Sequence, residues 1–598
     1  MNLLTRRNQI ILPFLVATLL GCFASSRNAE GVIPPPDGGY PNRNTAEGDD
    51  ALLSVTTGSN NTGLGWRGLL SNTTGSNNTA TGAGALIRNT TGNSNTANGV
   101  SALFHNLTGG NNTATGFGAL EFNTTGGNNT ANGFSALLSN DTGSYNTADG
   151  FDALASNIAG GFNTAVGAGA LFTNTADRNT AVGTGALASN TTGSDNSAHG
   201  ALALFFNTTG DNNTANGSEA LFFNTIGDNN TADGSGALFS NVNGVNNTAN
   251  GFNALLSTTM GNNNTAIGAS ALANNVSGSS NTASGAGALL NNTTGLNNTA
   301  NGLNALFANT TGSDNTAIGL NALAASALPD GNVAIGSHAL VSNTTGDHNT
   351  AMGFFALGSN TFGSLNVALG LDALVNNTEG NSNVAVGRQA MRNNTTGFSN
   401  VALGPFAGDN VTTADTVICL LSAGENVSGT TWIENIYGVT TVSGTTAPVV
   451  VSDGGQLGTV ASSKRFKKDI ATMETSSEAI LSLRPVTFHY KTDTKGTPQF
   501  GLIAEEVAKV DPALVLPDKE GKPYTVRYDA VNAMLLNEFL KEHKSVQEQG
   551  ATIARLEKQV EALTAGLQKM SAQIELNKPA PQTVYLPISP LNEGENNR

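Results

Sequence analysis

The chain has 598 residues, of which 12% are charged and 6% aromatic, while 72 are glycine. This length predicts several structural units. The low charge excludes a typical disordered tail, and glycine without a three-residue period excludes collagen. All of the net charge of −16 lies in residues 1–461, because residues 462–598 hold 18 of the 27 basic and 18 of the 43 acidic side chains. Since the long acidic part has no basic patch, we expect no nucleic-acid partner.

The N-terminal residues 1–24 have the features of a secretory signal peptide. Arg6 and Arg7 precede an apolar run from Ile10 to Leu20, and small residues follow it. The run Leu-Leu-Gly-Cys that ends at Cys22 resembles a bacterial lipoprotein cleavage box, in which Cys22 would be lipidated; ordinary signal cleavage is the alternative. We therefore expect an exported protein, at the cell surface, in the outer membrane or extracellular, with membrane contact only through such a lipid.

Residues 25–43 are expected to form a linker, and a repeat with a period of 17 residues fills residues 44–410. The phrase NTA-x-G-x-x-A-L-x-x-NTTG-x-N recurs in 22 copies, and one step, from Ala165 to Ala181, is a residue short. One such unit is too small to fold alone, but stacked units can share a thin continuous core. We expect two short strands per coil, at Thr-Ala-x-Gly and x-Ala-Leu, separated by NTTG turns. Leucine would form an inward ladder, and Asn and Thr would form ladders between coils.

The repeat by itself favours a spacer, and rows of Thr and Asn that bind ice or glycan are the alternatives. Its NTA-x-G-x-x-A pattern resembles the heads of trimeric autotransporter adhesins, a resemblance that implies parallel β-rolls associating in threes. No metal or cofactor is expected, because the scattered residues His105, His199, His338 and His348 lack metal-ligand spacing. The two cysteines give no disulfide framework, and Cys419 lies between apolar neighbours, as a buried small residue would.

Residues 411–461 are rich in β-branched residues, Gly and Ser, and predict a β-rich neck. Four blocks follow in order: ASSKRFKKDI from Ala461, LRPVTFHY at 483–490, GLIAEEV at 501–507 and YDAVNAMLLNEFLKEH at 528–543. These blocks resemble the intramolecular chaperone domain of phage endosialidase tail spikes, and they place such a domain at 462–545. The resemblance implies a domain that promotes trimerisation of the fibre before it and then cuts itself off.

The self-cleavage motif of that family, Ser-x-x-Arg-x-Lys, is matched by Ser462, Arg465 and Lys467. The resemblance implies cleavage between Ala461 and Ser462, with Ser462 and Lys467 as the catalytic pair and Arg465 in support. Many members have Asp where this chain has Ser463. The chemistry fits the residue types, because a serine hydroxyl needs a base, and a lysine amine can serve where burial or neighbouring cations make it release its proton. A solvated basic run beside an ordinary serine is the alternative.

A coiled coil is expected at 546–577, followed by a disordered tail at 578–598. Apolar residues hold one heptad register from Leu535 to Ile574, with 3 and 4 spacing alternating without a break from Ile553. Ile or Val at a and Leu at d favour two strands, whereas the family resemblance implies three. An amphipathic helix packed on a globular face is the alternative.

The predicted fold class is therefore mainly β: a parallel β-solenoid or β-roll of 17-residue repeats, then a small α+β chaperone domain and a C-terminal trimeric coiled coil. The predicted function is a secreted or surface-anchored homotrimeric fibre whose C-terminal domain assists assembly and removes itself. The alternatives are an adhesin or phage-like receptor-binding fibre that recognises cell-surface glycan, and a hydrolytic tail spike. The last would need paired carboxylates in a groove, and the repeats carry Asp and Glu only singly.

Overall fold

The computed structural model describes residues 40–452 and 454–577, which divide into one unit up to Thr440 and a second unit from Thr441. The predicted signal peptide with Cys22, the linker up to residue 39 and the predicted tail at 578–598 lie outside the described residues. No described helix is both long and apolar enough to span a membrane.

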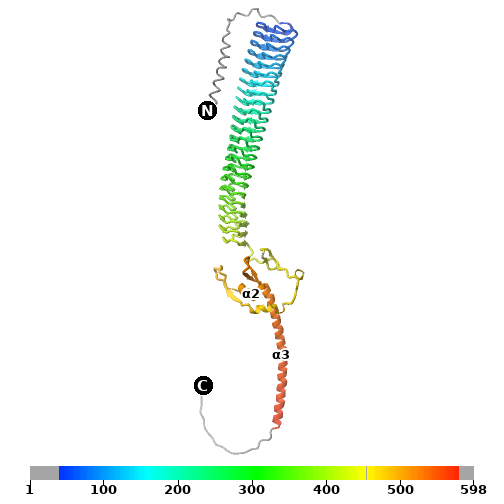
Figure 1. Ribbon diagram of the computed structural model, residues 1–598, viewed down its shortest axis with the longest axis vertical. Coiled ribbons are helices and arrows are strands. Elements are labelled where there is room, and N and C mark those ends of the chain that lie inside the picture. The colour runs from blue at the N-terminus through cyan, green and yellow to red at the C-terminus, as the bar shows by residue number, and fades with distance from the viewer. Residues whose placement is uncertain (1–39, 453, 578–598) are drawn as a thin grey trace, which may run out of the picture. The chain divides into compact units, whose positions relative to one another are not determined.

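The first unit is a parallel β-solenoid, whose coils stack along one axis in Figure 1. After a 3₁₀ turn at Pro41–Arg43, each coil adds one three-residue strand to a single sheet of 24 strands, and each strand pairs in parallel with the next one along the chain. The strands of the repeats are β1 Thr45–Glu47, β2 Thr62–Leu64, β3 Thr79–Thr81, β4 Thr96–Asn98, β5 Thr113–Thr115, β6 Thr130–Asn132, β7 Thr147–Asp149, β8 Thr164–Val166, β9 Thr180–Val182, β10 Ser197–His199, β11 Thr214–Asn216, β12 Thr231–Asp233, β13 Thr248–Asn250, β14 Thr265–Ile267, β15 Thr282–Ser284, β16 Thr299–Asn301, β17 Thr316–Ile318, β18 Val333–Ile335, β19 Thr350–Met352, β20 Val367–Leu369, β21 Val384–Val386 and β22 Val401–Leu403.

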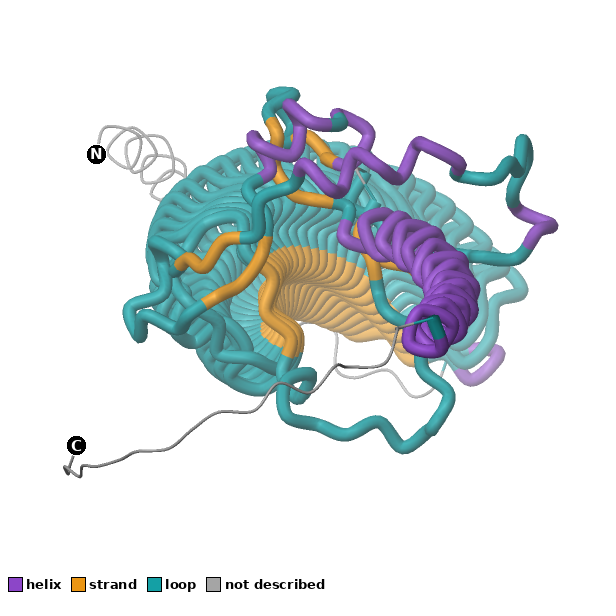
Figure 2. The backbone as a smooth tube through the Cα atoms, turned by 90° about the horizontal axis from the view of Figure 1, so that it is seen from below, coloured by secondary structure: helices purple, strands orange, loops and turns teal. Residues whose placement is uncertain are grey.

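The predicted solenoid and its leucine ladder are confirmed. In each strand the central small residue faces inward, and the residues on either side of it face outward, as the two-residue period of a strand requires. Ala80, Ala85 and Leu86 of one coil have no exposed surface, and the same positions are buried in the coils above and below. The short step from Ala165 to Ala181 keeps the two alanines paired, because the missing residue falls in a turn. Figure 2 shows the strands of successive coils lying over one another in one band.

The second predicted strand of each coil, at x-Ala-Leu, is wrong. The leucine of that segment has a positive φ in nearly every coil, for example 52° at Leu86, and a strand needs φ near −120°. The segment is therefore a turn, although its backbone still bonds from coil to coil: the amide of Leu86 donates to the carbonyl of Ala102 at 3.0 Å. Left-handed backbone is unfavourable for leucine, and the burial of its side chain in each coil that carries it offsets that cost.

Two columns of buried asparagines hold the coils together, as the predicted ladders require. The amides of Asn78 and Asn89 both donate to the carbonyl of Gly92, at 2.9 and 3.1 Å. The side-chain oxygen of Asn61 accepts from the backbone amide of Asn78, one coil later, at 3.0 Å. A side chain at Gly92 would not fit, because its Cβ would lie 2.3 Å from the carbonyl oxygen of Gly109. The repeated Asn and Gly are therefore structural requirements of the coil.

One asparagine column is interrupted where the repeat departs from its consensus. The side-chain oxygens of Asn241 and Asn309 are buried and have no hydrogen-bond partner among the described residues. In each case the next coil carries a shorter side chain in that column, Thr258 or Ser326, which has no amide to donate. Two further side-chain oxygens of this column also have no partner among the described residues: that of Asn157, which precedes the short coil, and that of Asn394, which is followed by the aliphatic residue Val411.

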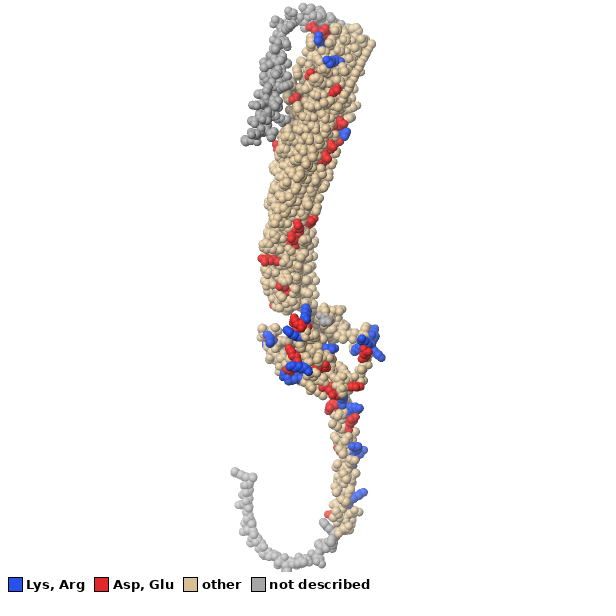
Figure 3. Space-filling model, in the orientation of Figure 1, with Lys and Arg blue, Asp and Glu red and all other residues tan. Residues whose placement is uncertain are grey.

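The solenoid continues past residue 410, into the segment predicted as a neck. Two more strands, β23 Ile418–Leu420 and β24 Thr431–Ile433, extend the sheet, with Cys419 and Trp432 in register with Ala402. Cys419 faces inward and is buried, as predicted. The stack goes on without the repeat phrase because the parallel pairing of the backbone continues, although the inward residue of β24 is the large and half-buried Trp432. The outer surface of this unit carries few charged side chains on the face seen in Figure 3.

The second unit is small and mixed. It contains the hairpins β25 Val450–Val451 with β26 Leu457–Gly458, β27 Val486–Phe488 with β28 Gln499–Gly501, and β29 Val515–Pro517 with β30 Pro523–Val526. Its helices are the 3₁₀ segments η2 Lys464–Phe466, η3 Glu474–Ser482 and η4 Pro512–Leu514, the short α2 Ala504–Val510 and the long α3 Tyr528–Leu576. The only buried hydrophobic residues among those described in this unit are four: Val507, Leu514, Val526 and Met534.

The long helix α3 exposes the apolar stripe predicted for a coiled coil. Within this single chain, Ile553, Val560 and Leu567 are 55%, 59% and 62% exposed. An apolar stripe of this length is the pattern of a helix that packs on other helices. The helix is confirmed, and its coiled coil stays a prediction.

Candidate functional site

The residues of the predicted cleavage motif come together through one short turn. Ser463 and Lys467 are extended, and the 3₁₀ turn η2 between them reverses the chain, with the amide of Lys467 donating to the carbonyl of Lys464 at 3.1 Å. This turn brings Nζ of Lys467 to 3.2 Å from Oγ of Ser462, which is hydrogen-bond distance. The pair is thus formed locally, from residues five apart in the sequence.

The two members of this pair lie in the open. Ser462 and Lys467 are both exposed, and so is Ala461 on the other side of the predicted scissile bond. Within the described part of the chain, no carboxylate lies at ion-pair distance from Lys467. A lysine without a carboxylate partner is a better candidate for a base, because an ion pair would favour its charged form.

Arg465 is not part of the contact between Ser462 and Lys467. Its guanidinium lies over the ring of Phe466, 4.7 Å from the ring centre, in a cation–π arrangement. The structure therefore brings together two of the three motif residues, and it places Arg465 on the neighbouring aromatic side chain.

A second contact between a serine and a lysine lies in the same unit, and sequence reasoning missed it. Ser477 on η3 is fully buried and bonds to Glu538, while Asn537 donates to its hydroxyl at 2.7 Å. Lys541 lies 3.5 Å from that hydroxyl but 2.7 Å from Glu538. The hydrogen bond that Lys541 donates to Glu538 raises the pKa of Lys541, so this lysine keeps its proton. The cluster joins η3 to α3, and its lysine is held as the charged partner of Glu538.

The remaining sequence blocks meet around the start of α3. Arg484 forms a two-point ion pair with Glu506, at 2.6 and 3.0 Å, and this bond lowers the pKa of the Glu506 carboxyl. The hydroxyl of Tyr528 accepts from the amide of Leu502 at 3.0 Å. No signal in a single sequence pairs these residues, which lie 22 and 26 positions apart.

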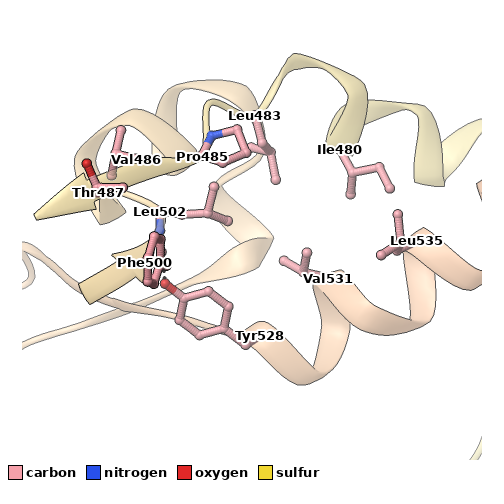
Figure 4. A pocket seen from close by; sticks show the side chains of 11 residues that line it. Ile480, Leu483, Pro485, Val486, Thr487, Phe500, Leu502, Tyr528, Val531 and Leu535 are labelled. Atoms are coloured by element: carbon pink, nitrogen blue, oxygen red, sulfur yellow. Dashed lines mark hydrogen bonds between the residues drawn. The ribbon is translucent and has the colours of Figure 1, made fainter. Parts of the chain in front are cut away.

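An open apolar cavity of about 680 Å³ lies between η3, the β27–β28 hairpin and the start of α3 (Figure 4). Ile480, Leu483 and Leu502 point into it from one side, and Val531 and Leu535 line it from α3. Its lining has no charged side chain, and its two hydroxyl groups belong to Thr487 and to Tyr528, whose oxygen accepts the hydrogen bond from Leu502.

No other chemistry emerges from the described residues. Among them no group of three or more His, Cys, Asp and Glu side chains could hold a metal ion, and the four histidines of the repeat stay apart from one another. Burial raises the pKa of the Cys419 thiol, which therefore stays protonated inside the solenoid.

Residues 462–516 match the family described as "Chaperone of endosialidase". The match begins at Ser462 and contains Arg465, Lys467 and the Arg484–Glu506 pair. No curated protein and no solved structure matches the chain significantly.

Proposed function

We propose that this chain is the subunit of a homotrimeric fibre, and that its C-terminal part assists assembly and then cuts itself off between Ala461 and Ser462. The observation that carries the proposal is the 3.2 Å contact between Ser462 and Lys467 at the first residue of the matched domain. The solenoid is the fibre, and the acidic repeat region contrasts with the charge-balanced piece that would leave it.

The reaction needs only atoms of this chain and one water molecule. Lys467, in its neutral form, takes the proton of the Ser462 hydroxyl, and Oγ attacks the carbonyl carbon of Ala461. Lys467 passes that proton to the departing nitrogen as the C–N bond breaks, so that an ester joins Ala461 to Oγ and the amino group of Ser462 becomes free. Water hydrolyses the ester, which leaves a carboxylate on Ala461 and restores the serine hydroxyl.

Assembly would supply the burial that the Ser462–Lys467 pair lacks in the single chain. Ser462 and Lys467 are exposed to water in the single chain, and packing against neighbouring chains would enclose the pair and exclude water from it. The exposed stripe on α3 provides the surface on which chains would gather. Cleavage would therefore follow assembly, and the C-terminal part would assist assembly once before it is released.

Export to the cell surface or beyond forms part of the same proposal. It rests on the basic and apolar pattern of residues 1–24, which ends at Cys22.

The test is the expression of the full chain and of single variants. The parent chain should release a C-terminal piece of 137 residues that begins with Ser462. Ser462→Ala should stay intact, and Lys467→Ala should be processed about 100- to 10,000-fold more slowly, which is the usual effect of losing a general base. Lys519→Ala is the matched control, because it removes an exposed lysine of the same unit outside the motif and should cleave as the parent does. Cleavage of both active-site variants between residues 461 and 462 at the parent rate would refute the catalytic pair.

A further inference from the structure

The outward face of the sheet changes its chemistry along the solenoid. In β1–β16 only four of the 32 outward strand residues are apolar, and the first outward residue is always Thr or Ser. In β17–β24 thirteen of the sixteen are apolar, and the second outward residue is Ile, Met, Leu or Val in every strand. None of these sixteen residues is charged. We call the outward residues of β17–β24 the apolar face.

The fold of a single chain does not require this change. The coils of β1–β16 form with Thr or Ser as the first outward residue, and β17–β22 keep the inward alanine that β3–β16 have. Within the single chain the apolar face is also incompletely covered: Met352, Leu403 and Ile433 are 43%, 41% and 42% exposed. A contiguous exposed apolar patch of this kind marks an interaction surface.

We infer that the apolar face is where copies of this chain pack against one another, and that the Thr- and Asn-rich face of β1–β16 remains free of such contacts. The inference rests on the proposed self-assembly and adds where along the solenoid the subunits are joined.

Charge limits where a second copy can pack. Residues 1–461 hold 25 acidic and 9 basic side chains, so parallel copies repel one another along most of their length. The apolar face is an uncharged strip on which like chains can approach.

Size also favours a second copy. Eight strands spaced by about 4.8 Å give a face about 34 Å long and about 10 Å wide, or roughly 350 Å². A stable interface with a separate protein buries about 800 Å² on each partner. A face this small needs a partner already held at high local concentration, and the α3 stripe at the C-terminal end of the same chain would provide that in register.

The test measures thiol labelling by a maleimide in the assembled full chain, read by peptide mapping. Met352→Cys reports on the apolar face, and Thr115→Cys reports on the same position of β5 in the polar part. We expect the Met352→Cys thiol to react at least about tenfold more slowly than the Thr115→Cys thiol, which corresponds to about 1.4 kcal/mol of protection. Native Cys419 is buried and maps to another peptide.

A second set of variants separates association from folding. Val333→Thr, Val367→Thr and Val384→Thr together install the residue that the same column carries in β3 to β9, so the coils should still form. In this background the Met352→Cys thiol should react as fast as the Thr115→Cys thiol. If the full chain is oligomeric and the two thiols already react equally in the parent background, the inference is wrong and the proposed assembly stands. If sedimentation shows a monomer, the proposed assembly and the inference both fall. Protection of Met352→Cys in a monomer would mean that another segment of the same chain covers the face, and would overturn the inference.

Discussion

Replacing Thr258 by asparagine should stabilise the solenoid around that coil. Thr258 is buried in the asparagine column, and the side-chain oxygen of Asn241 above it has no partner among the described residues. In an intact stretch of the column, Asn224 donates to the oxygen of Asn207 at 2.7 Å and to the carbonyl of Gly227 at 3.0 Å. An asparagine at position 258 would make the equivalent bonds.

The expected gain in stability of the Thr258→Asn chain follows from the two hydrogen bonds that the substitution changes. A buried acceptor without a donor costs about 1–3 kcal/mol, and the substitution would satisfy the oxygen of Asn241. It would also give Asn275 a side-chain oxygen in place of the hydroxyl of Thr258, from which its amide now lies 3.4 Å away. We therefore expect the free energy of local opening to rise by about 1–3 kcal/mol.

Hydrogen exchange followed by mass spectrometry measures this local opening, which a global melting curve of a long solenoid would average out. Amides in the peptides that cover residues 241–275 should exchange about 5- to 150-fold more slowly. Thr248→Asn is the matched control, since it makes the same chemical change at an exposed strand position. Unchanged or faster exchange in the Thr258→Asn chain would refute the account of the ladder.

Two further predictions concern the coil itself. Gly193→Ala should destabilise the solenoid strongly, because its Cβ would lie 2.3 Å from the carbonyl oxygen of Gly210; Gly169→Ala, whose Cβ meets nothing within 4 Å, should cost only about 1–2 kcal/mol for its positive φ. Urea unfolding measures the free energy of unfolding of both variants, and an equal loss of stability in Gly193→Ala and Gly169→Ala would contradict the packing argument. Deleting one whole unit of 17 residues should preserve secondary structure and solubility, whereas deleting 8 residues should misfold the solenoid, because leucine would no longer stack on leucine. Equal thermal melting of the two deletions would contradict the solenoid register.

Periodicity made much of the solenoid predictable. A strict 17-residue period forces equivalent residues to lie over one another, so the register, the leucine ladder and the place of the short step could be read from the repeat. The backbone at Leu86 could not, because leucine rarely adopts positive φ and only the closure of a very narrow coil requires it. The extension through β23 and β24 was missed for a different reason: Cys419 and Trp432 hold the inward position there, outside the repeat phrase.

The candidate site was predictable only where the chemistry is local. Ser462 and Lys467 lie five residues apart, and one turn between them is enough to bring them together. The cluster of Ser477 with Glu538 and Lys541 joins residues more than 60 positions apart, and nothing in a single sequence pairs them. Arg465 lies over the ring of Phe466, a contact that the motif could not predict because it gives residue types and spacing but not the direction of a side chain; its supporting role stays a prediction.

The central claim is that assembly through the C-terminal helix precedes self-cleavage. Replacing Ile553, Val560 and Leu567 together by Asp would put three charges in the α3 stripe, far from the Ser462–Lys467 pair in sequence, and a buried charge is costly. The measurement is a time course that follows oligomeric state by sedimentation and the 137-residue product by mass in the same samples. The account predicts an uncut monomer or aggregate of the triple variant, while the parent chain assembles and is then cut. Cleavage of the triple variant as a monomer at the parent rate would contradict it.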